Sequence, residues 1–202
     1  DPGRGSFVAD QARALADAGV SVTVASWETA IRRGAYAAID GPAPEPWMRA
    51  LAEDAALTPP IPGSWGGGVP VVRIPAVLAR RADAPADPLA DAERQAESLL
   101  AVGTALAARQ RIDVIHAHTG LPDGIAALAL AERLGVPLVI TEHDSTIAAR
   151  LDSESIRAAY RRLTGDGRQL LAVSETLRRR LVDARGGDEP AIRVVPNIVD
   201  VD

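Results

Sequence analysis

The sequence predicts an α/β domain built on a doubly wound, mostly parallel, Rossmann-like sheet. Short apolar runs, at residues 114–115 and 138–140 among others, are bounded by polar or Gly/Pro residues and have the length of buried strands. Segments with helical spacing alternate with these strands, which is typical of a parallel sheet with crossover helices. Polar residues follow several strands, at the edge where such sheets bind ligands.

Caps and periodicity place the helices and strands in chain order. Ser6 is suited to cap a first helix, in which Phe7, Ala12 and Leu15 recur at helical spacing, and Gly19 ends it. The other expected strands lie at 20–24, 69–74, 112–118, 137–142, 170–173 and 192–195, and the other expected helices lie near 46–56, 89–110, 122–134, 153–164 and 174–185.

The N-terminal turn and the segment 27–68 depart from this regular pattern. A turn containing Gly3 and Gly5 opens the chain. Because a Gly-rich turn that enters a helix normally follows a strand, we expect that the first strand is missing from this chain. Residues 27–68 hold all three tryptophans. An irregular stretch of this length is usually functional, so we expect it to lie over the strand-end edge of the sheet.

Composition excludes several classes of protein. The formal net charge of −5 argues against nucleic-acid binding, although the basic cluster at 178–180 leaves contact with phosphates or a membrane surface open. No run of about 18 apolar residues is present, so no transmembrane helix is expected. The absence of cysteine excludes disulfides and thiolate metal sites, and fits a cytoplasmic protein, either free or at the inner face of the membrane.

All three histidines stand where apolar runs stop. His116 and His118 lie in the segment IDVIHAHTG, and His143 lies in LVITEHD. Because parallel strands end at the same edge of a sheet, we expect these side chains to gather at one site. His118 ends its strand and should point into a cleft, where an imidazole can hydrogen-bond a hydroxyl group or help a proton move. His116 sits deeper on the same strand face, as expected of a hydrogen-bonded core histidine.

Four segments follow one another along nearly the whole chain: PGRGSFV at 2–8, DVIHAH at 113–118, VITEHD at 139–144, and AVSE at 172–175 taken together with VPNIVD at 195–200. Together they resemble the N-terminal domain of GT-B glycosyltransferases of family 4. The last segment is the most specific, because it is similar to the VPNGVD segment that links the two domains of these enzymes. Ile198 stands where the family usually has glycine.

The resemblance implies the acceptor-binding half of a retaining, metal-independent glycosyltransferase, which transfers a sugar from a nucleotide-sugar to a carbohydrate, lipid-linked or small-molecule acceptor. It implies an N-terminal Rossmann-like domain at 1–195 and the start of an interdomain linker at 196–202. The C-terminal domain, which binds the donor in this family, would lie beyond Asp202, so we expect this fragment alone to be inactive. The donor is a substrate, and no cofactor or metal is implied.

Candidate site residues follow from the same resemblance. His118 is the second histidine of its motif and is expected near the transferred sugar, as the catalytic residue. Gly3 and Gly5 are expected to let backbone N–H groups approach the donor diphosphate at a helix N-terminus. Candidates for the cleft or the acceptor site are Thr119, Glu142, His143, Ser174, Trp27, Trp47 and Trp65. A structural role competes for some of them: Ser174 is suited to cap a helix, and a tryptophan often anchors a loop.

Two other classes of function remain open from the sequence. A metal-dependent hydrolase could use the His-x-His pair, with His143 and Asp144 completing a zinc or two-metal site. No further histidine or carboxylate pattern supports this alternative. A non-catalytic binding domain of Rossmann type is the other alternative, because a fold does not determine a function.

Overall fold

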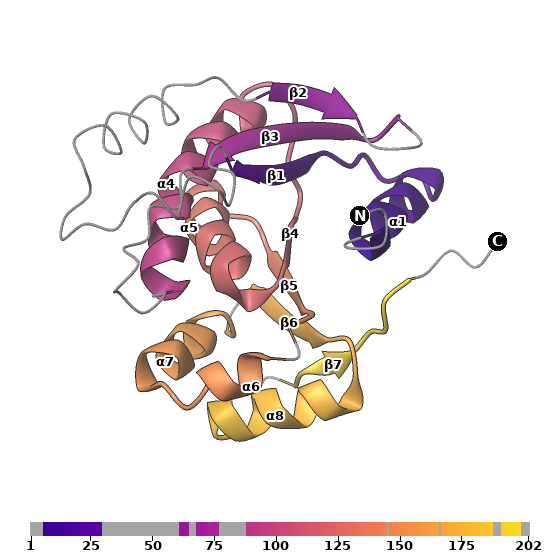
Figure 1. Ribbon diagram of the computed structural model, residues 1–202. Helices are drawn as coiled ribbons and strands as arrows, with labels where there is room; N and C mark the ends of the chain where they lie inside the picture. Colours follow the sequence, from indigo (N-terminus) through magenta and orange to yellow (C-terminus); the bar gives the residue numbers. More distant parts are fainter. Residues whose placement is uncertain are drawn as a thin grey trace, which may run out of the picture. The chain divides into compact units, whose positions relative to one another are not determined.

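The computed structural model describes residues 6–29, 61–64, 68–76, 88–144, 146–165, 167–187 and 191–198 (Figure 1). The chain forms two compact units. The first comprises residues 1–87 together with 200–202, and the second comprises residues 88–199. The expected helix near 46–56 and the chain ahead of Ser6, where the missing first strand was inferred, lie outside the described residues.

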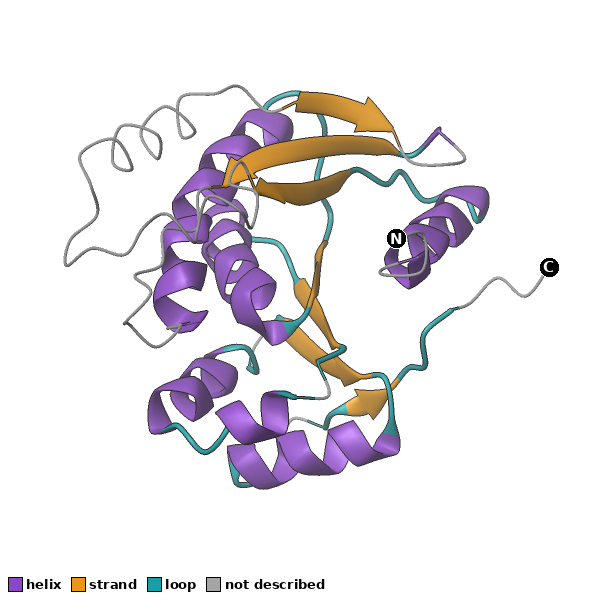
Figure 2. Cartoon of the chain, in the orientation of Figure 1, coloured by secondary structure: helices purple, strands orange, loops and turns teal. Residues whose placement is uncertain are grey.

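Among its described residues, the first unit has helix α1 and a three-stranded mixed sheet (Figure 2). Helix α1 (Ser6–Asp17) precedes strands β1 (Val24–Thr29), β2 (Ile61–Ser64) and β3 (Pro70–Ala76). The strand order is β1-β3-β2, with β1 parallel and β2 antiparallel to β3. Strand β2 falls in the segment for which no strand was predicted, because a Pro-Gly pair obscures its period.

Strand β1 begins at Val24, four residues later than the alternating pattern predicts, and the first of those residues belongs to the end of α1. The N–H of Gly19 donates to the carbonyl of Ala16 at 2.9 Å, and the N–H of Val20 donates to that of Leu15 at 3.0 Å. Gly19 has a φ of 86°. These are the bonds of a Schellman motif, which ends a helix with a left-handed residue. The predicted C-terminal glycine is therefore confirmed, and Val20 belongs to the cap.

The second unit carries a four-stranded parallel sheet in the order β4-β5-β6-β7. Its elements are α4 (Pro88–Ala107), β4 (Ile115–His118), the π-helical turn η2 (Gly120–Gly124), α5 (Ile125–Leu134), β5 (Leu138–Glu142), α6 (Ile147–Arg150), α7 (Glu154–Arg162), β6 (Arg168–Ala172), α8 (Glu175–Arg185) and β7 (Arg193–Val194). All of these strands and the longer helices were predicted, with ends shifted by a few residues, whereas α6 was not. The α/β class with parallel strands is therefore confirmed.

The strand order of the second unit determines which face its helices cover. Each crossover connection leads to the next strand in the same direction across the sheet. Because such crossovers are right-handed, they place α5, α7 and α8 on one face of the sheet, as Figure 1 also shows. The core forms there, from Ala117, Leu138, Ile140, Leu170 and Ala172 of the strands and from helix residues such as Leu128, Ala159 and Leu181. Alternate strand residues point to the opposite face.

Within the described residues β4 pairs only with β5, so the histidine-bearing strand is the first of these four strands. Its carboxyl end meets that of β5, as the sequence predicts for a parallel pair. Among the described helices, none is both long enough and apolar enough to cross a membrane.

Candidate active site

The two histidines of β4 share the face of the sheet that points away from the helices. The register pairs His116 with Val139 and His118 with Thr141, while Ala117 between them is buried in the core. The Nε2 atom of His116 lies 2.8 Å from the Oγ1 atom of Thr141. Thr141 is a buried residue, only 4% exposed. His116 is therefore held by a buried hydroxyl, in agreement with the structural role that the sequence suggested for it.

His143 joins the pair from the carboxyl end of β5. The Nδ1 atom of His118 lies 2.9 Å from the Nε2 atom of His143, within hydrogen-bonding distance. The rings of His116 and His118 stack with centroids 4.5 Å apart, and those of His118 and His143 stack with centroids 5.1 Å apart. The three histidines thus form one continuous imidazole stack, as expected from their positions at the strand ends.

This imidazole stack is electrically neutral near pH 7. Burial, together with the charges that His116 and His143 would carry, lowers the pKa of His118 to about 3. Burial and the neighbouring His143 lower the pKa of His116. Burial also lowers the pKa of His143, against the opposing effect of a hydrogen bond with the Asn197 side chain. A neutral His118 offers hydrogen bonds, but it holds no proton to donate as an imidazolium acid.

Glu142 holds the turn that follows His118. This carboxylate is completely buried, and its Oε2 atom accepts hydrogen bonds from the backbone N–H of Gly120, at 2.9 Å, and from the hydroxyl of Tyr160. Its Oε1 atom accepts a bond from the N–H of Asp144 at 2.8 Å. Both oxygens are therefore used within the protein. The sequence placed Glu142 among the cleft candidates, but its position on the helix-covered face makes it a structural residue of the site.

Gly120 is required at this turn because the aromatic ring of Tyr160 lies against it. A Cβ atom at position 120 would stand 2.6 Å from both Cζ and Oη of Tyr160. Burial raises the pKa of Glu142, and the bonds from Tyr160, Asp144 and Gly120 partly oppose this rise. The pKa of Tyr160 is raised far above its usual range, by burial and by the charge of Glu142. Sequence reasoning missed Tyr160, because its helical position gives no sign of a partner elsewhere.

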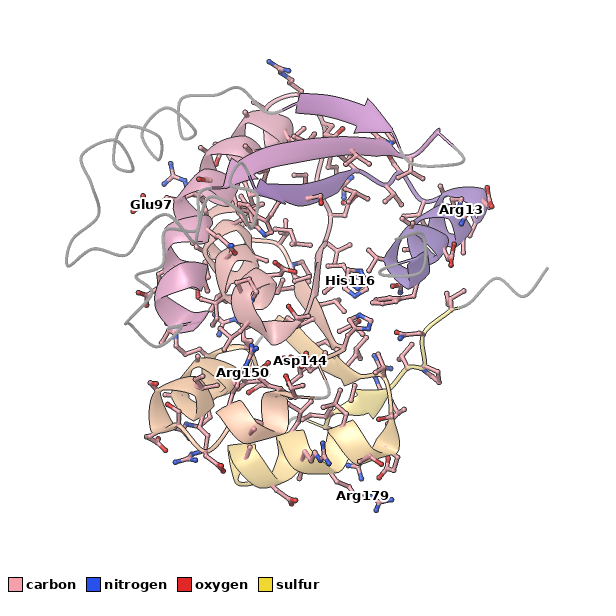
Figure 3. All side chains as sticks on the ribbon, viewed as in Figure 1. Arg13, Glu97, His116, Asp144, Arg150 and Arg179 are labelled. Atoms are coloured by element: carbon pink, nitrogen blue, oxygen red, sulfur yellow. The ribbon has the colours of Figure 1, made fainter. Side chains whose placement is uncertain are left out.

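Asp144 organises the loop after His143. Its Oδ1 atom accepts hydrogen bonds from the backbone N–H and the hydroxyl of Thr146, at 2.8 and 2.6 Å. The guanidinium of Arg150 lies 3.5 Å from the other carboxylate oxygen, and Figure 3 shows the two side chains close together. These partners occupy both oxygens of Asp144, so its contacts are those of a loop-stabilising residue rather than a metal ligand.

The remaining candidates lie in different places. Thr119 has a φ of 82°, and its side chain makes no capping hydrogen bond to the turn that follows. Its backbone N–H donates to the carbonyl of Thr141 at 2.8 Å, and its hydroxyl donates to the carbonyl of Leu121 at 3.1 Å. Ser174 caps α8, because its Oγ atom accepts from the N–H of Leu177 at 3.2 Å. Trp27 is half-buried in β1 of the first unit. Outside the described residues lie Gly3, Gly5, Trp47 and Trp65.

The basic cluster at 178–180 is largely engaged within its own helix. Arg178 donates to both carboxylate oxygens of Glu175, at 2.9 and 2.8 Å, and Arg179 lies 3.3 Å from the same carboxylate. These arginines lower the pKa of Glu175 to about 2. In the part of the chain that the structure describes, no group of three histidine, aspartate or glutamate residues is arranged to hold a metal ion.

The fold and the site together define an α/β domain with neutral imidazoles at the ends of parallel strands. The model of the protein family described as "Glycosyltransferase Family 4" matches residues 3–202, almost the whole chain. The chain therefore belongs to glycosyltransferase family 4, as its four sequence segments indicated. No curated protein matches the chain significantly.

Proposed function

We propose that this chain is the acceptor-binding half of a retaining, metal-independent glycosyltransferase that takes its sugar from a nucleotide-sugar. In this proposal residues 1–195 form the N-terminal domain and residues 196–202 begin the linker to a donor-binding domain. The family supports glycosyl transfer in general. The donor class, the stereochemistry and the independence from metal are the finer parts of the proposal.

The observation that carries the proposal is the environment of His118. It stands at the carboxyl end of β4, on the sheet face opposite the helix layer, and it is uncharged. A neutral imidazole suits a sugar, because sugar hydroxyls are neutral donors and acceptors and do not need a charged partner. Such a hydrogen bond positions the transferred sugar, and positioning contributes strongly to the rate of a group transfer.

The same environment restricts the chemistry that we assign to His118. At neutral pH it does not act as an imidazolium acid toward the leaving diphosphate, since its pKa is about 3. Stabilisation of the diphosphate is assigned instead to the backbone N–H groups of Gly3 and Gly5 at the start of a helix, together with the second domain. Thr119 and His143 remain proposed contacts at the cleft, and Trp27, Trp47 and Trp65 remain proposed acceptor contacts.

The test uses a protein that carries both domains, incubated with a panel of nucleotide-sugars, and measures nucleoside diphosphate release. We expect turnover with one of these donors, and a loss on the order of 10²-fold in His118→Ala, typical of removing one well-placed polar contact. Thermal unfolding of the variant controls for folding. Normal turnover in a folded His118→Ala protein would remove His118 from the site.

Three further measurements test the finer parts. Proton NMR of the product reads the anomeric configuration, and inversion would contradict the retaining mechanism. Turnover in excess chelator should be unchanged, and a loss that added metal restores would favour the metal-dependent alternative. Cell fractionation tests the proposed cytoplasmic location and any peripheral contact with a membrane.

A further inference from the structure

His118 has only one ring nitrogen left for a ligand. Its Nδ1 atom faces the Nε2 atom of His143 at 2.9 Å, and its ring stacks on the rings of both His116 and His143. Two neutral imidazoles form a single hydrogen bond between them, in which one N–H donates and one lone pair accepts. The direction of that bond therefore decides whether the Nε2 atom of His118 is a donor or an acceptor.

The surroundings of the two rings favour donation from His118 to His143. A hydrogen bond between like groups is strongest when the less basic ring donates and the more basic ring accepts. His118 is the less basic ring, because burial and two neighbouring imidazoles act on it. A hydrogen bond with Asn197 works against the effect of burial on His143, which keeps that ring the better acceptor.

We propose that His143 is a positioning residue, which holds His118 in the tautomer protonated at Nδ1 and thereby leaves its Nε2 lone pair to accept a hydrogen bond from a hydroxyl group of the bound sugar. This inference rests on the proposed function, because that function supplies the ligand. It adds an action through His118 to the position at the cleft that is proposed for His143. It also gives Asn197 a role, since Asn197 hydrogen-bonds His143 from the segment that follows β7.

A pair of substitutions at position 143 separates positioning from packing. The terminal amide of glutamine reaches about as far as the Nε2 atom of histidine, whereas that of asparagine reaches only as far as the Nδ1 atom. In His143→Gln the amide oxygen can still accept the bond from His118. In His143→Asn that bond is lost, although polarity and charge match those of the glutamine variant.

The first readout is the tautomer, and it needs no substrate. The chain has only three histidines, so ¹⁵N-histidine labelling of an untagged protein gives three imidazole spin systems, each assignable by substitution. We expect His118 to be protonated at Nδ1 in the native protein and in His143→Gln, and to lose this preference in His143→Asn. A native His118 protonated at Nε2, or an unchanged tautomer in His143→Asn, overturns the proposal.

The second readout is turnover in the two-domain protein. We expect His143→Asn to lower kcat about tenfold or more, as misplacement of a catalytic group does, and His143→Gln to recover most of this loss. Equal losses in both folded variants overturn the positioning role. If His118→Ala has normal turnover while the tautomer results stand, then the proposed function fails and not the His143–His118 hydrogen bond. The tautomer measurement on the native protein decides the matter even if a variant fails to fold.

Discussion

Removal of the Tyr160 hydroxyl tests the buried network behind the candidate site. Tyr160→Phe keeps the ring that lies against Gly120 and deletes only the donor that Glu142 accepts. Glu142 is 0% exposed, so water does not replace the lost bond. The backbone N–H groups of Gly120 and Asp144 remain as its hydrogen-bond donors, at 2.9 and 2.8 Å.

The magnitude follows from the charge of the acceptor. A hydrogen bond to an ionised, buried group contributes about 1.5–3 kcal/mol, whereas a bond between neutral groups contributes about 0.5–1.5 kcal/mol. With Glu142 ionised, we therefore expect Tyr160→Phe to lower the free energy of unfolding by about 1.5–3 kcal/mol. For a chain of this length each kcal/mol shifts Tm by about 2–4 °C, which corresponds to a decrease of roughly 3–12 °C.

The pH dependence has a definite sign. Burial raises the pKa of Glu142 in the folded protein, so between the unfolded and folded pKa values the folded state binds more protons and the free energy of unfolding falls as pH rises. The Tyr160 hydroxyl lowers this pKa, and its removal raises it further. The cost of Tyr160→Phe should therefore be smaller at about pH 5 than at about pH 8.

Urea denaturation at several pH values, with Tm as a second probe, measures this cost. Glu142→Gln provides the matched background, because a neutral amide makes only a neutral bond with the hydroxyl. In a double-mutant cycle, Tyr160→Phe should lower the free energy of unfolding by less in the Glu142→Gln background than in the native protein. A cost below about 0.5 kcal/mol at alkaline pH, or a cost that falls as pH rises, would refute the assignment of an ionised Glu142 bonded to Tyr160.

Three more substitutions have expected outcomes. Gly120→Ala places a Cβ atom 2.6 Å from a buried ring and should lower the free energy of unfolding by about 1–3 kcal/mol, measured in denaturant. His116→Ala leaves the buried hydroxyl of Thr141 without this partner and should cost about 1–3 kcal/mol in denaturant, with a smaller effect on turnover than His118→Ala. Ser174→Ala removes the cap of α8 and should cost about 0.5–2 kcal/mol by thermal unfolding, without a change in turnover if capping is its role.

Most elements of the second unit could be predicted because local signals and packing agree there. The apolar residues of β5 and β6 are largely buried, and Gly135 and Gly186 end their helices in the left-handed conformation. The apolar run ahead of β4 is an exception, because Val114 is 50% exposed and Ile115 is only partly buried. The meeting of the histidines could also be predicted, because it depends only on the parallel direction of two strands.

The contacts that distinguish the site residues from one another could not be read in this way. Glu142 and His143 are adjacent in the sequence, yet one is completely buried under the helices and the other stacks on His118. Alternation along β5 separates their faces, but only the packed position of Tyr160 shows that the carboxylate is fully bonded. Which face of the sheet the helices cover depends on the order of the strands. Strand order is a tertiary property that the sequence pattern does not contain.

The neutrality of the imidazole stack connects the fold with the chemistry. A parallel sheet places strand ends about 5 Å apart, so histidines that end adjacent strands on one face come into ring contact. Three imidazolium charges at that spacing would repel one another, and burial would add to the cost. The protonated forms are therefore disfavoured together, and His118 keeps a lone pair even in mildly acidic solution, since its pKa is about 3. If the proposed function is right, turnover should not depend on titration of His118 between about pH 5 and 8, because the residue is already neutral throughout that range. A rate that rises with pH through this range in the native protein, and no longer does so in His118→Ala, would show that His118 loses a proton near neutral pH. That result would contradict a pKa held near 3 by burial and by the neighbouring imidazoles.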